Sequence, residues 1–416
     1  MYHQYAPALM SAGFRRLWVA NLTSMMGFWM LLVSQGWLVV AMTDSPFMLG
    51  VLAFFRSIPM LVLSPLGGIL ADRVRKTSLL LAAQGIMAAT DLTIGVLVLL
   101  GRVEMWHLAV AGVSLGSAFA LSMPARTALI SDLVPRGVVS NAVALTSTTV
   151  NSARVIGPTV AGFLIGLIGI AGTYFTQVGA YLFAFMNIRA INTADTTQEH
   201  GGSAIRAMGD GFRYVFRTPT LLALMVLGTS PALFSMPMVM LMPVFVKQEL
   251  RSGPQELGVL LGLLGVGAIT GSILVVAFSR LKYKGAAVML AALMDALLVI
   301  SLAFSDSLLK AGIAVVLMGV FQSIYLAMIQ TILQLITTDR MRGRVISIWM
   351  LGWGLTPVGL LPMSAVAESM GTPFAMVLSG SLGVLVAVGV MLFARPLWRL
   401  TPDSEDAIQP DNHLGE

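Results

Sequence analysis

Five charged residues interrupt long apolar stretches of this sequence. Their side chains are of types that can bind protons or anions. They are Arg56, Asp91, Arg126, Arg154 and Asp295. A charge inside a membrane-spanning segment costs about 2.5–3.5 kcal/mol on insertion scales, so each one needs a reason. Asp91 and Asp295 are the acids well inside such stretches, and buried carboxyl groups are suited to binding and releasing protons. Pairing with a neighbouring helix is the alternative interpretation for both.

Arg154 belongs to a polar stripe at helical spacing, which we expect to border an internal cavity. The stripe consists of Ser147, Asn151, Arg154 and Pro158. Arg154 and Arg56 could bind an anionic substrate there or steer a proton. Arg126 lies close to a predicted helix end, where snorkelling to the surface or pairing with Asp132 is favoured over substrate contact.

The elements that must position these residues are membrane helices. Hydrophobic residues make up 57% of the chain, charged residues only 11%, and the mean hydropathy is +0.87. Long intervals carry no charge between their ends, among them 16–44, 217–247 and 344–368, and about 20 apolar residues suffice to cross a bilayer. We predict an all-α integral membrane protein of twelve transmembrane helices. They begin near Leu17, Phe47, Ser78, His107, Ser140, Gly172, Pro219, Glu256, Ala286, Lys310, Val345 and Pro373.

The basic residues predict the orientation of these helices. With the N-terminus inside, most of them flank inner loops, and only Arg102, Lys247, Arg251 and Lys310 flank outer loops. Both termini are therefore expected in the cytoplasm, and the protein in the cell inner (cytoplasmic) membrane as a multi-pass protein. The net charge of +6 reflects this bias, so no nucleic-acid partner is expected.

An internal repeat divides the chain into two six-helix bundles. Gly116 corresponds to Gly319, and Asp91 to Asp295, at an offset of about 203 residues. The predicted boundaries are 1–191 for the N-terminal bundle, 192–217 for a cytoplasmic linker, 218–395 for the C-terminal bundle and 396–416 for a cytoplasmic tail.

Several chemistries are excluded by what the sequence lacks. It has no cysteine, and its four histidines are scattered without metal-ligand spacing, so no metal site is expected. It has no phosphate-binding Gly-x-x-x-x-Gly-Lys-Ser/Thr loop, which excludes ATP-driven pumping by this chain. No serine, histidine and acid are arranged for hydrolysis, so we expect no enzyme activity. No cofactor is expected, and the energy for any transport must come from an ion gradient.

A charged loop, Gly68-Ile-Leu-Ala-Asp72-Arg73-Val-Arg75-Lys76, separates the second and third predicted helices. It resembles the signature of the major facilitator superfamily, and the resemblance covers nearly the whole chain. Arg75 departs from the usual Gly or Asp of that signature. The resemblance implies a cytoplasmic gate formed by Gly68, Asp72, Arg73, Arg75, Lys76, Arg126 and Asp132. A topology signal alone is the other interpretation of this loop.

Other motifs resemble one branch of that superfamily, which contains the enterobactin exporter and macrolide efflux proteins. They are Arg56-Ser-Ile-Pro59, Pro124-Ala-Arg126 and Arg154-Val-Ile-Gly157-Pro158. Gly157, Pro158 and Gly162 in the fifth helix resemble an antiporter motif, although Ala161 replaces one usual glycine. This implies export coupled to inward proton flow. Ordinary close packing of helices is the alternative.

The resemblance further implies that the first, fourth, seventh and tenth helices line the substrate cavity. The expected substrate and coupling residues are Gln35, Arg56, Asp91, Asn151, Arg154, Gln330, Gln334 and Trp353. Amide and aromatic side chains suit a large amphipathic molecule. We therefore expect a monomeric secondary transporter, embedded in lipid, that exports a drug-like or siderophore-like small molecule in exchange for protons. An importer, a passive facilitator or a non-transporting membrane scaffold or receptor are the alternatives.

Overall fold

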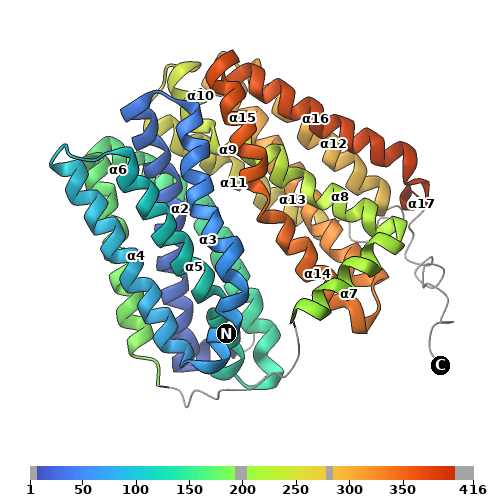
Figure 1. Ribbon diagram of the computed structural model, residues 1–416, viewed down its shortest axis with the longest axis horizontal. Coiled ribbons are helices and arrows are strands. Elements are labelled where there is room, and N and C mark those ends of the chain that lie inside the picture. Colours follow the sequence, from blue (N-terminus) through green and yellow to red (C-terminus); the bar gives the residue numbers. More distant parts are fainter. Residues whose placement is uncertain (1–6, 193–203, 278–283, 399–416) are drawn as a thin grey trace. The chain divides into compact units, whose positions relative to one another are not determined.

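The computed structural model describes residues 7–192, 204–277 and 284–398, in which every regular element is a helix (Figure 1). Contacts divide the chain into two units. The first comprises Met1–His200 with Val246–Gly262, and the second Gly201–Phe245 with Leu263–Glu416. The segment Val246–Gly262 thus belongs by its contacts to the unit of the N-terminal half, although it comes later in the sequence.

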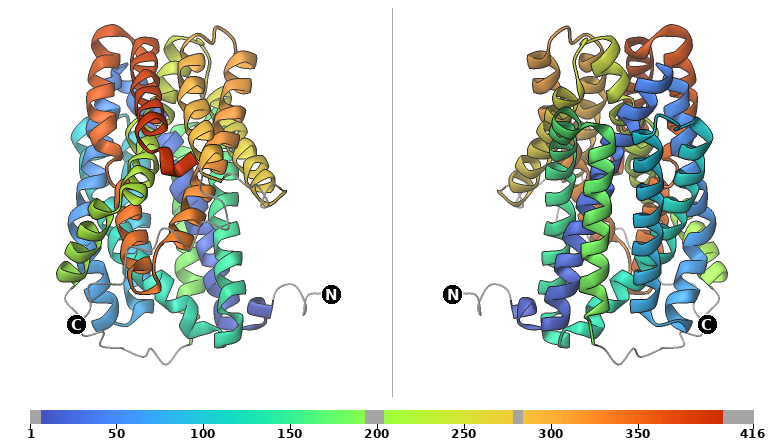
Figure 2. Two further views of the ribbon diagram at one scale, coloured as in Figure 1. Left: turned by 90° about the vertical axis from the view of Figure 1, so that its right-hand side faces the viewer. Right: turned by 90° about the vertical axis from the view of Figure 1, so that its left-hand side faces the viewer.

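The first unit is a bundle of long helices. Its elements are η1 (Pro7–Met10), α2 (Ala12–Thr43), α3 (Pro46–Arg73), α4 (Lys76–Leu99), α5 (Met105–Leu133), η2 (Arg136–Val138) and α6 (Val139–Arg189). Helices α2 to α6, coloured blue to green, lie side by side in Figures 1 and 2. α2 packs against α6, α3 against α5, and α4 against both α5 and α6. Ser11 and Ser45 cap the starts of α2 and α3 by accepting hydrogen bonds from backbone N–H groups of the first turn.

Helix α6 contains a break at Gly169. The backbone there has φ 74° and ψ 177°, a conformation that glycine adopts readily and other residues rarely do. Two helices therefore meet at this residue. The sequence predicts separate fifth and sixth helices beginning near Ser140 and Gly172, and Gly169 lies between these positions.

The second unit has shorter helices. They are α7 (Ala204–Arg217), α8 (Pro219–Leu233), α9 (Ser235–Met240), α10 (Met242–Gln248), α11 (Pro254–Ala277), α12 (Lys284–Ala303), α13 (Leu308–Ile336), α14 (Asp339–Trp353), α15 (Thr356–Met370), α16 (Thr372–Phe393) and α17 (Arg395–Trp398), with α10 and α11 shared between the units. The predicted seventh helix is divided into α8, α9 and α10, and the eleventh into α14 and α15. Pro231, Pro237 and Pro243 account for the first division, because each removes a backbone donor.

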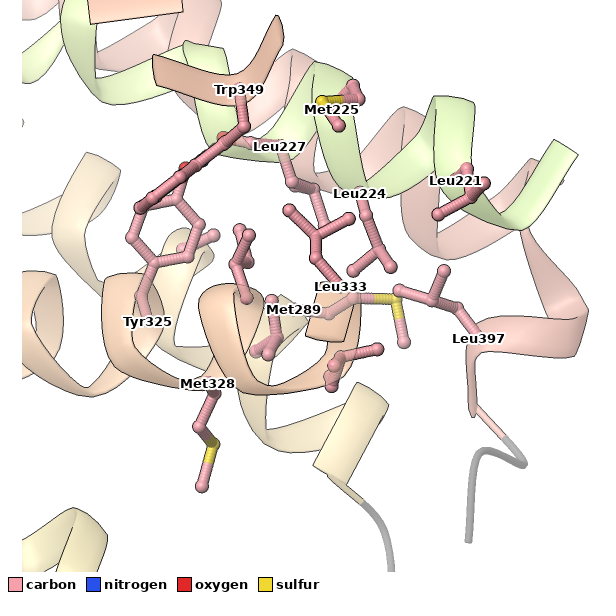
Figure 3. Close-up of a cluster of buried hydrophobic side chains, with 14 of the residues drawn as sticks. Leu221, Leu224, Met225, Leu227, Met289, Tyr325, Met328, Leu333, Trp349 and Leu397 are labelled. Atoms are coloured by element: carbon pink, nitrogen blue, oxygen red, sulfur yellow. Dashed lines mark hydrogen bonds between the residues drawn. The ribbon is translucent and has the colours of Figure 1, made fainter. Parts of the chain in front are cut away.

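The core of the second unit joins α8, α12, α13, α14 and α17. Tyr325 and Trp349 lie at one side of it and Leu397 at the other, with Leu224 and Met289 between them (Figure 3). The hydroxyl of Tyr325 donates a hydrogen bond to the backbone carbonyl of Leu227, which satisfies a polar atom inside this apolar cluster.

Ten helical stretches in the described part of the chain are long and apolar enough to cross a membrane. α6 counts once among the ten, and α3 contributes only a shorter apolar stretch, Pro46–Met60. Dividing α6 at Gly169 and adding α3 would give twelve. That number, the orientation of the termini and the predicted bundle boundaries remain predictions. The described part of the predicted linker, from Ala204 onward, forms helix α7.

Candidate functional site

A buried polar cluster surrounds Tyr181 in the first unit. Tyr181 belongs to α6 and is 1% exposed, and its ring packs against Gly27 of α2, where a Cβ atom would lie only 3.0 Å from the ring. Asp91 of α4, Arg126 of α5 and Arg56 of α3 each lie close enough to interact electrostatically with Tyr181. Five helices therefore contribute to one group of polar and charged side chains.

Asp91 is the acid of this cluster, and it is fully buried. Neither of its carboxylate oxygens has a hydrogen-bond partner among the described residues, and the same is true of Nε and Nη1 of Arg126. An isolated carboxylate in an apolar interior costs several kcal/mol, and binding a proton removes that cost. The arrangement is thus suited to a carboxyl group that exchanges a proton with its surroundings.

Buried hydrogen bonds hold the helices around this cluster. Gln177 of α6 donates to the hydroxyl of Ser34 in α2 at 2.8 Å, and Gln84 of α4 donates to the hydroxyl of Ser24 in α2 at 3.0 Å. Two serine hydroxyls of α2 therefore join it to α4 and α6. Gln35, a predicted substrate residue on the same helix, is 8% exposed.

Arg154 lies over the ring of Trp29 on α2, with its guanidinium carbon 5.7 Å from the ring centroid. This distance allows a cation–π interaction. Gly157, one turn further along α6, makes room for the same residue, because a Cβ there would lie 2.7 Å from Cβ of Trp29. Asn151, on the preceding turn, is exposed.

The other small residues of the predicted antiporter motif also lie at close contacts. Pro158 is buried within α6, which continues through it. A Cβ at Gly162 would lie 2.7 Å from Cα of Gly258 in α11, and Thr159 donates a hydrogen bond to the Gly258 carbonyl at 3.3 Å. These contacts explain the small residues as packing, and the antiporter role remains a prediction.

The charged signature loop joins α3 to α4. Nζ of Lys76 lies 2.5 Å from Oδ2 of Asp132, and the two side chains are 11% and 21% exposed, so the pair fixes the start of α4 to the end of α5. Arg73 and Arg75 are exposed. Arg126 differs from expectation: it neither reaches the surface nor pairs with Asp132, because it is 6% exposed within the cluster around Tyr181.

Several predicted residues fall elsewhere. Gly68, Asp72 and Trp353 lie outside the residues whose side chains the structure describes. Gln330 and Gln334 are exposed on α13 in the second unit. The cytoplasmic gate and the substrate residues therefore remain predictions, and only Arg56, Asp91 and Arg126 come together around Tyr181.

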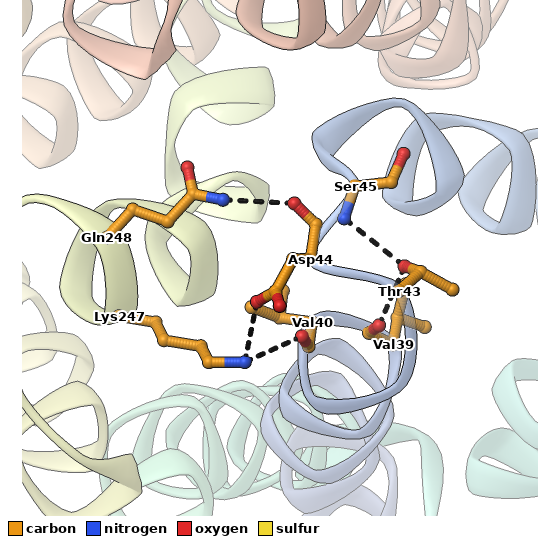
Figure 4. Close-up of polar contacts among 7 residues, drawn as sticks. All are labelled: Val39, Val40, Thr43, Asp44, Ser45, Lys247 and Gln248. Atoms are coloured by element: carbon orange, nitrogen blue, oxygen red, sulfur yellow. Dashed lines mark hydrogen bonds and ion pairs between the residues drawn. The ribbon is translucent and has the colours of Figure 1, made fainter.

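A second polar site in the first unit explains why Val246–Gly262 groups with it. Nζ of Lys247 lies 2.6 Å from Oδ1 of Asp44 and donates to the Val40 carbonyl at 2.9 Å (Figure 4). Gln248 donates to the Asp44 carbonyl at 2.9 Å. These bonds lie at the C-terminal end of α2, where the Val40 carbonyl also accepts a hydrogen bond from the backbone N–H of Asp44.

The second unit has its own buried acid, Asp295 of α12, which is 3% exposed. The hydroxyl of Ser235 in α9 donates to its Oδ2 at 2.5 Å, and Oδ1 has no partner among the described residues. Tyr325 of α13 lies close enough to interact with it electrostatically.

Sequence reasoning missed the tyrosines of the first unit. Tyr174, Gln177 and Tyr181 recur at i, i+3 and i+7, which places them on one face of α6. The rule that identified the stripe around Arg154 would have found this stripe too.

Ten apolar helical stretches together with ionisable groups buried inside them define a multi-pass membrane protein. The family model described as transmembrane secretion effector, part of the major facilitator superfamily, matches residues 3–416. The chain belongs to this family of membrane transporters.

Curated relatives agree with this assignment. The chain is 23% identical over 363 residues to the multidrug efflux pump Tap of Mycolicibacterium fortuitum, covering 85% of this chain and 88% of Tap. It is 24% identical over 391 residues to the enterobactin exporter EntS of Shigella boydii, covering 91% of this chain and 93% of EntS. An uncharacterised MFS-type transporter of Bacillus subtilis, YfiS, is 31% identical, but over 186 residues, 43% of each chain.

Solved structures show the same fold. A bacterial homologue of the human lysosomal transporter Spinster, crystallised in an inward-facing, occupied conformation, superposes with a TM-score of 0.72 at 16% identity. The match covers 94% of this chain and 98% of that structure.

Proposed function

We propose that this transporter exports an amphipathic, drug-like or siderophore-like small molecule in exchange for protons. Export is supported by the relatives Tap and EntS, which are named as a multidrug efflux pump and an enterobactin exporter. The transporter works as a monomer in the inner membrane, by alternating access of its two predicted six-helix repeats.

The proposal of proton coupling rests on the buried cluster around Tyr181. Asp91 is fully buried without a hydrogen-bond partner among the described residues, and Tyr181 interacts electrostatically with it and with Arg126 and Arg56. A proton on Asp91 changes the net charge of this cluster by one unit, which alters the interactions between α3, α4, α5 and α6. Proton binding can thereby favour one conformation of the first unit over another.

Substrate recognition is assigned to Arg154, Arg56 and the amide residues predicted with them. Arg154 stacks on Trp29, so a flat aromatic or anionic group could contact the ring and the guanidinium together. The charged loop with Asp72 serves as the cytoplasmic gate. Asp72→Asn should leave the protein folded and inserted but lower transport, and full transport by this variant would exclude the gate.

Everted membrane vesicles test direction and coupling. Vesicles energised to be acidic inside should accumulate ethidium or enterobactin, and the arrival of the compound should dissipate the proton gradient. A protonophore should abolish both effects, and vesicles without the protein provide the control. Accumulation that persists with the protonophore would overturn proton antiport, and equilibration without accumulation would indicate the alternative, a passive facilitator.

A further inference from the structure

An apolar groove opens on the surface of the second unit, where α8 begins and α16 ends. Its volume is about 410 Å³, within the range of small-molecule sites. The lining residues include Pro219, Thr220, Ala223, Val226, Gly389 and Phe393. Leu397 of α17 also lines it and belongs to the core shown in Figure 3.

Gly389 keeps this groove open. A Cβ atom at Gly389 would meet no atom within 4 Å, so this glycine does not serve the close approach of another helix. On the rim, Phe393 is 89% exposed and Val226 is 44% exposed. Both α8 and α16 belong to stretches apolar enough to cross a membrane, and the groove lies at the start of α8 and the end of α16. In helices that span the bilayer, such ends are where hydrocarbon meets headgroups.

Helix α7, which leads directly into α8, supplies positive charge beside the groove. Phe212 and Phe216 are exposed and stacked with ring centroids 6.4 Å apart, while Val215 is buried in the core. Arg213 and Arg217 are also exposed, and within the described chain neither forms an ion pair. Exposed aromatic and basic side chains together are typical of a helix lying in a membrane interface.

The acid of α7 does not neutralise these arginines. Asp210 is held by Arg344 of α14, whose Nη1 lies 3.1 Å from Oδ2. Trp398, which follows the lining residue Leu397 and is 42% exposed, adds an aromatic side chain of the kind enriched at membrane interfaces. The groove is apolar, and the helix that leads into it carries two arginines without an ion-pair partner among the described residues. An amphipathic anion would suit both features.

We propose that this groove binds an anionic phospholipid, with an acyl chain between α8 and α16 and its phosphate beside Arg213 and Arg217. Guanidinium groups bind phosphate oxygens through paired hydrogen bonds, and basic pockets beside transmembrane helices hold acidic headgroups. The lipid would fasten α7 to the membrane surface. This site is separate from the cluster around Tyr181 and does not depend on the direction of transport.

Lipid binding to the purified full-length protein tests the proposal without a transport assay. The protein is delipidated in detergent, supplied with equal amounts of dioleoylphosphatidylglycerol and dioleoylphosphatidylcholine, and the retained lipids are counted by native mass spectrometry. Phosphatidylglycerol should be retained preferentially, by about fivefold for each arginine. Arg213→Gln with Arg217→Gln should remove this preference, and Gly389→Leu should lower retention of both lipids by filling the groove.

Matched controls lie in the first unit. Arg102→Gln removes an exposed arginine from another loop, and Gly179→Leu adds a side chain at another open glycine, where a Cβ also meets no atom within 4 Å. Both should behave as wild type. Equal retention of the two lipids by wild type, a preference that survives loss of both arginines, or unchanged retention in Gly389→Leu would each overturn the proposal.

Discussion

Each of the two units has a buried acid among its described residues, Asp91 in the first and Asp295 in the second, and the two differ in their hydrogen bonds. Asp91 of α4 has no hydrogen-bond partner among the described residues, whereas Asp295 of α12 accepts a bond from Ser235. Tyr181 interacts electrostatically with Asp91 and also with Arg56 and Arg126, whereas the tyrosine that interacts with Asp295 is Tyr325. If the predicted repeat holds, these two positions correspond, and they differ in hydrogen bonding: the acid of the first unit has no partner among the described residues, and the acid of the second accepts a bond.

The largest effect should come from removing the charge of the first acid. Asp91→Asn keeps the size of the side chain but cannot release a proton, so proton-driven accumulation should fall at least about tenfold, equivalent to about 1.4 kcal/mol. Asp295→Asn should retain most of it. Accumulation of ethidium and the accompanying proton flux, measured in everted vesicles, compare the two variants. Full coupling in Asp91→Asn would move the proton site elsewhere in the chain.

Substitutions of Arg154 test whether transport depends on a second charged residue of the first unit besides Asp91. Arg154→Ala removes the charge and the stacking on Trp29, so transport should be lost, whereas Arg154→Lys should retain part of it because the charge remains. Uptake rates over a range of substrate concentrations would show the loss. Normal transport by Arg154→Ala, at equal protein levels, would show that the polar stripe containing Arg154 has a structural role and does not bind substrate.

Ser235→Ala makes the second acid resemble the first. It removes the hydrogen bond that Asp295 accepts, leaving this carboxyl without a partner among the described residues, so the free energy of unfolding should fall by about 1–3 kcal/mol. Denaturant unfolding in detergent micelles, followed by tryptophan fluorescence, measures this. In Asp295→Ala the same serine substitution should cost much less, and equal costs in both backgrounds would contradict a structural pairing of the two residues.

Much of the fold followed from charge-free intervals, because an uninterrupted apolar stretch of sufficient length has few alternatives in a membrane. The division of the predicted seventh helix at Phe234 and Leu241 was not predicted. Membrane helices often tolerate proline without ending, so the prolines in this stretch do not show from sequence alone where one helix stops.

The candidate site was only partly predictable. The sequence identifies Arg56, Asp91 and Arg126 as costly charges, but each lies on a different helix, and only tertiary packing brings them to Tyr181. For the same reason the partner of Asp132 was misassigned: Lys76 and Asp132 lie on different helices, and nothing in the local pattern pairs them.

The smallest effects should come from two ion pairs of the first unit, which sharpen the comparison because their side chains differ in exposure to solvent. The pair of Lys76 with Asp132 is largely buried, with side chains 11% and 21% exposed, whereas Lys247 and Asp44 are 34% and 68% exposed. Asp132→Asn should lower the free energy of unfolding by about 1–2 kcal/mol, because the ammonium group of Lys76 loses its partner away from water.

Asp44→Asn should change the same quantity by less than about 1 kcal/mol, because solvent screens this pair. The backbone at Asp44 has φ 51°, and asparagine tolerates this left-handed conformation, so the substitution isolates the charge from backbone strain. Measuring the free energy of unfolding in low and high salt separates the contributions of the two ion pairs. Salt should weaken the exposed pair of Lys247 with Asp44 and affect the buried pair of Lys76 with Asp132 less. A larger cost for Asp44→Asn than for Asp132→Asn would show that the fastening of Val246–Gly262 to α2 stabilises the first unit more than the signature loop does.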